Sequence, residues 1–90
     1  VGAVLLKPLQ KALTDNDPVY AVIKGGSINH GGKTNGFTVP NPDAQAALIQ
    51  QAFHSAMISP ETIHYVETHG TGTALGDPIE ITGLQKAFGN

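Results

Sequence analysis

The sequence predicts an α/β fold in which strands and helices alternate and pack in layers. Three observations lead to this prediction: short apolar runs typical of covered strands, two segments with strong helix-start signals, and a glycine- and threonine-rich loop that joins a strand to a helix. The expected order is strand, short helix, strand, long loop, helix, strand, glycine loop and helix.

The first elements are expected within the first 23 residues. Val1–Leu6 is an apolar run without polar alternation, which fits a strand covered on both faces. Pro8 starts a short helix over Leu9–Leu13, and the β-branched and aromatic residues of Val19–Ile23 indicate a second strand. Since only about a dozen residues separate the two runs, an antiparallel pair is expected.

Residues 25–42 form a long glycine-rich loop, and a loop of this length in a compact protein tends to be functional. Asn41 is a good N-cap and Pro42 a good first residue for the helix that follows. A second capped turn is expected at 59–62. The helix has one apolar face at three- and four-residue steps: Leu48, Ile49, Ala52, Phe53, Ala56 and Met57.

A third strand is expected over Ile63–Thr68, followed directly by the glycine loop 69–76. The next residues are a strong helix start, with Asp77 as N-cap, proline at the first position and Glu80 at the third for a capping box. Gly83 allows a neighbouring element to approach this helix closely.

Composition limits the classes of function. The 90 residues include no cysteine, which excludes disulfides, thiolate zinc sites and a cysteine nucleophile within the chain. The net charge is −2 without a basic patch, and no apolar run reaches the ~18 residues of a membrane span, so neither nucleic acid nor membrane is expected as a partner. Charged residues make up 13%, about half the usual ~25%, which suggests a chain packed on several sides; both ends suggest excision from something longer.

The candidate chemistry lies in the glycine loop. His69 follows a predicted strand and precedes a helix, which is where open α/β proteins place active sites. A neutral imidazole N–H can donate to a carbonyl oxygen on which negative charge develops. Thr71 and Thr73 add two hydroxyls suited to a polar, amide-bearing ligand.

Three other interpretations of these residues stay open. A Gly/Thr-rich strand-to-helix loop also resembles a phosphate-binding loop, although neither established glycine motif is present. The histidine could be a hydrogen-bonded structural residue. A metal site of His30, His64 and His69 would lack the local spacing of metal-binding pairs, so no metal is expected.

Fifteen consecutive residues, Val66–Glu80, resemble the histidine signature of β-ketoacyl synthases, in particular the ketosynthase domains of modular polyketide synthases. The upstream residues continue the resemblance, so that it covers nearly the whole chain. They are Lys7–Leu9, Asp15–Asp17, Val22–Gly25, Asn29 and Asn35–Asn41. The segment Asn29–Gly36 resembles the ketosynthases that are served by a separate acyltransferase.

The resemblance implies a thiolase-like layered α/β/α/β/α fold, built from two similar halves. Residues 1–40 would be the end of the N-terminal half with the connecting loop, and 41–90 the start of the C-terminal half with the histidine loop. The resemblance further implies a cytoplasmic homodimer, with the rest of the ketosynthase domain as an immediate partner.

The implied activity is decarboxylative Claisen condensation of an acyl thioester with a malonyl-type extender on acyl carrier protein. His69 matches the first of two catalytic histidines, and Thr71, Thr73 and Thr38 match positions along the phosphopantetheine arm. The segment itself would bind no cofactor, because phosphopantetheine arrives on the carrier protein. The alternative is a non-condensing ketosynthase-like domain that binds or passes on an acyl chain without extending it.

Several expected catalytic groups lie outside this chain: the nucleophilic cysteine, the second histidine and a lysine near it. The 90 residues alone are therefore expected to be inactive. Structural roles are expected for the remaining polar candidates, which are Asp77 and Glu80 as helix caps and His30, His54 and His64 as surface or packing residues.

Overall fold

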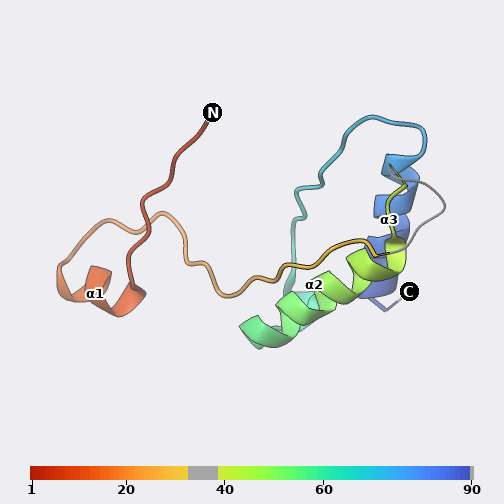
Figure 1. The fold of residues 1–90 in the computed structure, drawn as a ribbon. Helices are drawn as coiled ribbons and strands as arrows, with labels where there is room; N and C mark the ends of the chain where they lie inside the picture. Colours follow the sequence, from red (N-terminus) through yellow and green to blue (C-terminus); the bar gives the residue numbers. More distant parts are fainter. Residues whose placement is uncertain (33–38, 90) are drawn as a thin grey trace.

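The computed structural model describes residues 1–32 and 39–89. These residues form three α-helices, α1 (Leu9–Thr14), α2 (Pro42–Ala56) and α3 (Gly76–Ala87), and one 3₁₀ turn, η1 (Pro60–Thr62). Figure 1 shows α2 and α3 side by side at one end of the molecule, with α1 standing apart at the other. The predicted helices are therefore all present.

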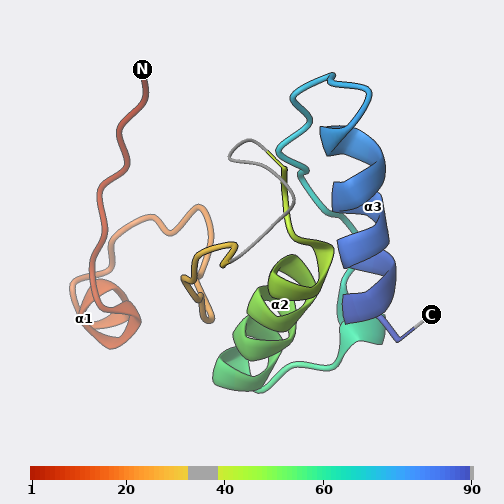
Figure 2. The ribbon, with the colours of Figure 1, turned by 45° about the vertical axis from the view of Figure 1, so that its right-hand side comes forward.

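The pairing of α2 with α3 is the main tertiary contact in the described residues, and Figure 2 shows the two helices lying against each other. Gly83 of α3 is buried, and a Cβ atom there would lie 3.0 Å from the Cβ of Gln45 and 3.2 Å from the carbonyl oxygen of Pro42. The prediction of a close approach at Gly83 is confirmed. At the other end of the pair, the rings of Phe53 and Phe88 meet edge to face, 5.2 Å apart.

The start of α2 follows the sequence prediction. The Asn41 side-chain oxygen accepts hydrogen bonds from the backbone N–H groups of Asp43 and Ala44, at 3.0 and 3.1 Å. Its amide nitrogen donates to the carbonyl oxygen of Gly31 at 2.7 Å. One side chain thus caps the helix and also fixes the incoming loop to it.

The end of α2 corrects the predicted apolar face. Met57 is the C-cap in the left-handed conformation, with φ of 53°, and its side chain is 92% exposed. The left-handed residue turns the chain off the helix axis, so Met57 no longer follows the helical period that places Phe53 toward α3.

Residues 25–31 run along α2 and are fixed to it by side chains. The Ser27 hydroxyl donates to the Leu48 carbonyl oxygen at 2.6 Å, and the Asn29 amide donates to the Ala44 carbonyl oxygen at 2.8 Å. Two residues of extended chain advance about as far as four residues of helix, so alternate side chains of this segment meet successive turns of α2.

The three predicted strands are not formed. Val1–Leu6, Val19–Ile23 and Ile63–Thr68 have no strand pairing in the part of the chain that the structure describes, so the expected antiparallel pair of the first two is wrong. Figure 1 shows the first segment far from the third. A strand exists only when a neighbour supplies backbone partners, and within residues 1–32 and 39–89 none of these segments has such a partner.

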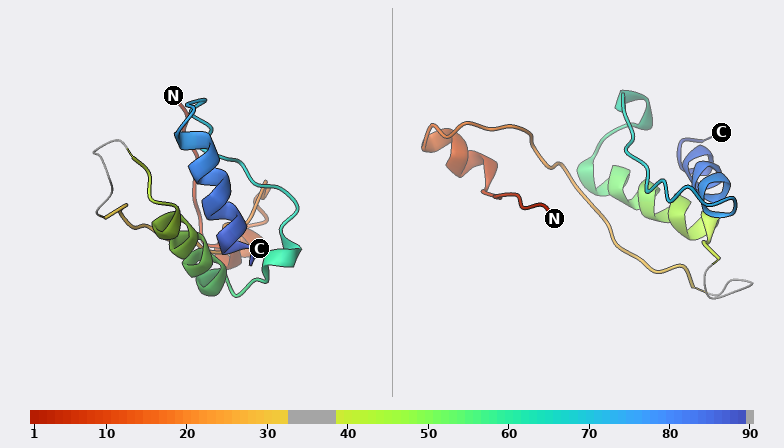
Figure 3. Two further views of the ribbon diagram at one scale, coloured as in Figure 1. Left: turned by 90° about the vertical axis from the view of Figure 1, so that its right-hand side faces the viewer. Right: turned by 90° about the horizontal axis from the view of Figure 1, so that it is seen from above.

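The N-terminal region is open to solvent. Lys7, which precedes α1, forms ion pairs with two aspartates that follow the helix. They are Asp15, at 2.7 Å, and Asp17. The right-hand view of Figure 3 shows this region standing apart from the α2–α3 pair. None of the helices described is long and apolar enough to cross a membrane.

Candidate active site

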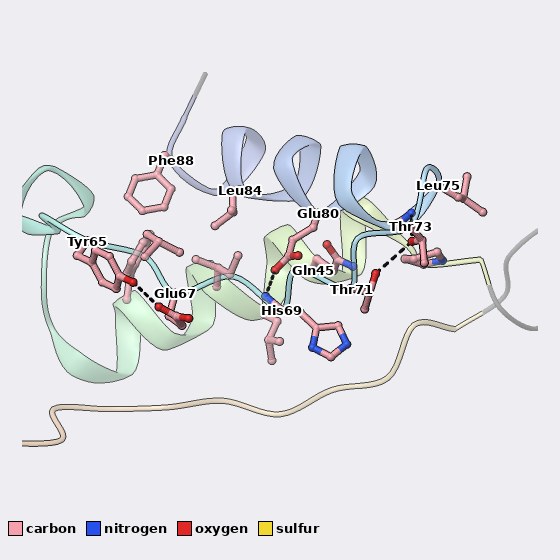
Figure 4. A pocket seen from close by; sticks show the side chains of 16 residues that line it. Gln45, Tyr65, Glu67, His69, Thr71, Thr73, Leu75, Glu80, Leu84 and Phe88 are labelled. Carbon is pink, nitrogen blue, oxygen red and sulfur yellow. Dashed lines mark hydrogen bonds between the residues drawn. The ribbon is translucent and has the colours of Figure 1, made fainter.

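A cavity of about 880 Å³ lies between the α2–α3 pair and the segment that contains the histidine loop. Its apolar wall includes Leu48, Ile49 and Phe53 of α2, Leu84 of α3 and Phe88 directly after α3. Its polar wall includes Glu67, His69, Thr71, Thr73 and Glu80 (Figure 4). The structure thus places three of the four predicted site residues at one cavity; the fourth, Thr38, lies outside the described residues.

His69 stands in the loop that leads into α3. Its backbone N–H donates to a Glu80 carboxylate oxygen at 2.7 Å. In Figure 4 the imidazole extends from the loop on the side away from α3, while the Glu80 side chain reaches from α3 to the loop backbone. His69 is exposed and lines the cavity.

The capping box predicted at the start of α3 is wrong. The helix begins two residues earlier than predicted, at Gly76, and the side chain of its N-cap, Leu75, makes no capping hydrogen bond. Asp77 instead accepts a hydrogen bond from the backbone N–H of Gly72 at 3.2 Å. Glu80 accepts from the N–H groups of His69 and Gly70, at 2.7 and 3.1 Å.

Both carboxylates therefore bind the loop and not their own helix end. The physical reason is competition between donors: the loop folds back over the first turn of α3 and offers N–H groups within reach of both side chains. The hydrogen bond from the His69 N–H, followed by that from Gly70, lowers the pKa of Glu80. Glu80 is thus a carboxylate at neutral pH.

The same contacts argue against phosphate binding at this loop. A phosphate-binding loop needs several backbone N–H groups free to point at the anion. Here the N–H groups of His69, Gly70 and Gly72 already donate to carboxylates. The two negative side chains would also repel a phosphate.

The hydroxyls of Thr71 and Thr73 form a coupled pair, 3.1 Å apart. The Thr73 oxygen also accepts from the N–H of Gly76 at 2.9 Å. Each hydroxyl has one hydrogen and two lone pairs, so one O–H donor and some acceptor capacity remain after these bonds, whichever threonine donates to the other. A secondary amide, which presents one carbonyl oxygen and one N–H, matches this capacity.

A second polar contact stands at the same cavity. The Tyr65 hydroxyl donates to a Glu67 carboxylate oxygen, and this hydrogen bond raises the pKa of Tyr65. Both residues belong to the extended segment before His69. They lie two residues apart, so they share one face of it.

The other three histidines are exposed and do not line the cavity. His54 lies on α2 and His64 on the extended segment, while the Nδ1 atom of His30 accepts from the N–H of Gly32 at 3.1 Å. Within residues 1–32 and 39–89, no three His, Asp or Glu side chains converge as metal ligands.

Comparison with known proteins identifies the family. Residues 20–90 match the family described as "Beta-ketoacyl synthase, C-terminal domain". The chain belongs to the β-ketoacyl synthase family. It is 66% identical over 88 residues to polyketide synthase PksL of Bacillus subtilis and 56% identical over 89 residues to polyketide synthase ThaG of Burkholderia thailandensis.

Solved ketosynthase domains have the same chain course. The match to the oxazolomycin ketosynthase domain OzmH KS7 of Streptomyces albus has a TM-score of 0.88 at 51% identity and covers 92% of this chain. The ketosynthase from module 6 of the bacillaene synthase of Bacillus subtilis matches with a TM-score of 0.87 at 46% identity over 91% of this chain. The fold class is therefore the thiolase-like one that the resemblance implied.

This chain covers a small part of each relative. The matches to PksL and ThaG cover 98 and 99% of this chain but only 2% of each of those proteins. The matches to the two solved ketosynthases cover 14 and 15% of those chains. In the two solved ketosynthases, the matching segment is thus a small part of a much larger chain and follows the same open course.

The loop-binding roles of Asp77 and Glu80 and the Tyr65–Glu67 contact were not predicted from the sequence. One signal was available for the first pair. Two carboxylates at the start of a helix, directly after a loop rich in glycine, have loop N–H groups as alternatives to the helix N–H groups.

Proposed function

We propose that this chain provides the histidine loop of a β-ketoacyl synthase that acts in polyketide biosynthesis. The proposed reaction is decarboxylative Claisen condensation of an enzyme-bound acyl thioester with a malonyl-type extender on acyl carrier protein. The observation that carries the proposal is the grouping of His69, Thr71 and Thr73 at one cavity, in a loop whose N–H groups at residues 69, 70 and 72 already donate to carboxylates.

In the extender step, the bond between the carboxylate carbon and the α-carbon breaks and carbon dioxide leaves. The electron pair forms an enolate, whose negative charge lies largely on the thioester oxygen. An imidazole N–H of His69 donates to that oxygen, and one prearranged donor of this kind is worth roughly 3 kcal/mol in acyl chemistry. The α-carbon then attacks the acyl thioester, whose C–S bond breaks to release the thiolate of a cysteine elsewhere in the enzyme.

The two threonines have a different role in the proposal. Phosphopantetheine carries amide groups along an otherwise apolar arm, and the coupled hydroxyls of Thr71 and Thr73 retain the donor and acceptor that one amide needs. The apolar wall formed by α2 and α3 suits the methylene groups of the arm. Thr38 is proposed as a further contact by family resemblance.

The proposal also includes acyl carrier protein as partner, a homodimeric ketosynthase and a cytoplasmic location, all three from family resemblance. The two similar solved ketosynthases belong to the oxazolomycin and bacillaene systems. Service by a separate acyltransferase, indicated by the Asn29–Gly36 segment, is part of the proposal as well.

The test uses the complete ketosynthase that contains this chain. The protein is loaded with an acyl thioester, malonyl carrier protein is added, and intact-protein mass follows acylation and extension. In the His69→Ala variant, acylation is expected to persist while decarboxylation and extension are lost. His54→Ala is the matched control, because His54 is exposed on α2 and does not line the cavity.

The outcomes separate the alternatives. Unchanged extension in His69→Ala would show that this histidine is structural. A wild-type protein that acylates but never extends would instead favour the non-condensing domain.

A further inference from the structure

We infer that Glu80 is a positioning residue for His69, acting through the backbone of the histidine loop. The inference rests on the proposed function, because it assigns Glu80 to the extender step and not to acylation. Glu80 need not touch the substrate; its carboxylate would fix the peptide from which the His69 imidazole projects.

The geometry is specific to this pair of donors. The two Glu80 oxygens accept separately from the N–H groups of His69 and Gly70, at 2.7 and 3.1 Å. Consecutive N–H groups that converge on one anion form a small concave anion site, and here the occupant is a side chain of the same protein. The orientation of the His69 peptide is therefore set from α3, eleven residues away in sequence.

The loop needs such an anchor. Gly70 and Gly72 both have positive φ, 58° and 77°, so the backbone directly after His69 adopts two conformations that depend on glycine. Asp77 holds the second of these positions through the N–H of Gly72. Glu80 holds the first, together with the His69 peptide.

A neutral amide cannot replace the carboxylate here. A glutamine of the same shape has one acceptor oxygen, and its NH₂ group would face one of the two N–H donors. Glu80→Gln therefore leaves one loop N–H opposite another donor, and the His69 peptide must shift to relieve this contact. Displacement of a catalytic group by about 1 Å can reduce rate by roughly 100-fold.

The test uses the complete ketosynthase and separates its two half-reactions. Glu80→Gln is expected to acylate at the wild-type rate, while kcat for decarboxylation of malonyl carrier protein falls roughly 10- to 100-fold with KM nearly unchanged. Glu61→Gln makes the same chemical change on η1, where the side chain is exposed and outside the cavity, and is expected to behave as wild type.

A second variant tests the anion site directly. Glu80→Ala vacates the position of the carboxylate, so added acetate is expected to restore part of the decarboxylation rate, whereas chloride at equal ionic strength is not. This readout keeps the inference testable if Glu80→Gln fails to fold, because a purely structural role gives no reason for rescue by a carboxylate.

The results distinguish this inference from the proposed function. Decarboxylation in Glu80→Gln within a factor of two or three of wild type, or loss of acylation together with extension, would overturn the positioning role while leaving the His69 result intact. Absence of acetate rescue in a folded Glu80→Ala protein would overturn it too. A wild-type protein that never extends would overturn the proposed function and this inference together.

Discussion

Separating these 90 residues from the rest of a ketosynthase is predicted to abolish cooperative unfolding. The physical reason is the very small core. The buried hydrophobic residues of the described chain are three alanines, Ala12, Ala46 and Ala87, and no large side chain is fully buried. Large apolar residues such as Leu5 and Tyr20 are almost completely exposed, at 99 and 101%.

The size of the deficit follows from surface and shape. The chain exposes 7432 Å², whereas a compact monomer of this mass exposes about 5,000 Å². Its radius of gyration is 16.1 Å, compared with about 12 Å for a compact domain of this length. The surface left uncovered is thus of the size that a domain core or a protein interface normally buries.

Differential scanning calorimetry of the purified 90-residue chain is the assay. A cooperatively folded domain of this length would show an endotherm of roughly 60 kcal/mol. We expect no such peak, and only weak helical circular dichroism, because isolated helices shorter than about 12–15 residues are marginal in water. A sharp endotherm near the full enthalpy would refute the reasoning, since it would require a core that the structure does not contain.

Three further predictions concern the complete ketosynthase. Asn41→Ala is expected to lower the free energy of unfolding by about 1–2 kcal/mol, because it removes the N-cap of α2. Asn41→Asp keeps the cap and loses only the hydrogen bond to the Gly31 carbonyl oxygen. Urea unfolding compares the free energies of the two variants. Gly83→Leu is expected to destabilise by about 1–3 kcal/mol, seen as a lower Tm, because even its Cβ would lie 3.0 Å from Gln45. Hydrogen exchange of the histidine loop is expected to accelerate at acid pH. Because the hydrogen bonds from the N–H groups of His69 and Gly70 lower the pKa of Glu80 in the folded state, these loop bonds are present at neutral pH and are lost as the pH falls through the lowered pKa. Protection of the loop that stays constant, after correction for intrinsic exchange, from neutral pH down to the lowest pH at which the protein remains folded would contradict this.

The sequence by itself predicted the features that depend on near neighbours in the chain. Asn41 caps α2 and proline follows it, as the local signals indicate, because an N-cap bonds to N–H groups two and three residues ahead. The grouping of Thr71 and Thr73 in one short loop is equally local, and these two hydroxyls do meet. The fifteen residues of the histidine signature were enough to indicate the family that the comparisons show.

The strands and the roles of the two carboxylates could not be predicted in this way. An extended segment such as Ile63–Thr68 becomes a strand only where another segment supplies partners, and the described residues contain none for it. Glu80 had donors available both in its own helix and in the loop, and its choice depended on how the loop folds over α3. Local hydrogen bonds are set by chain connectivity, whereas contacts between distant residues depend on how the elements are packed; only the tertiary structure could decide them.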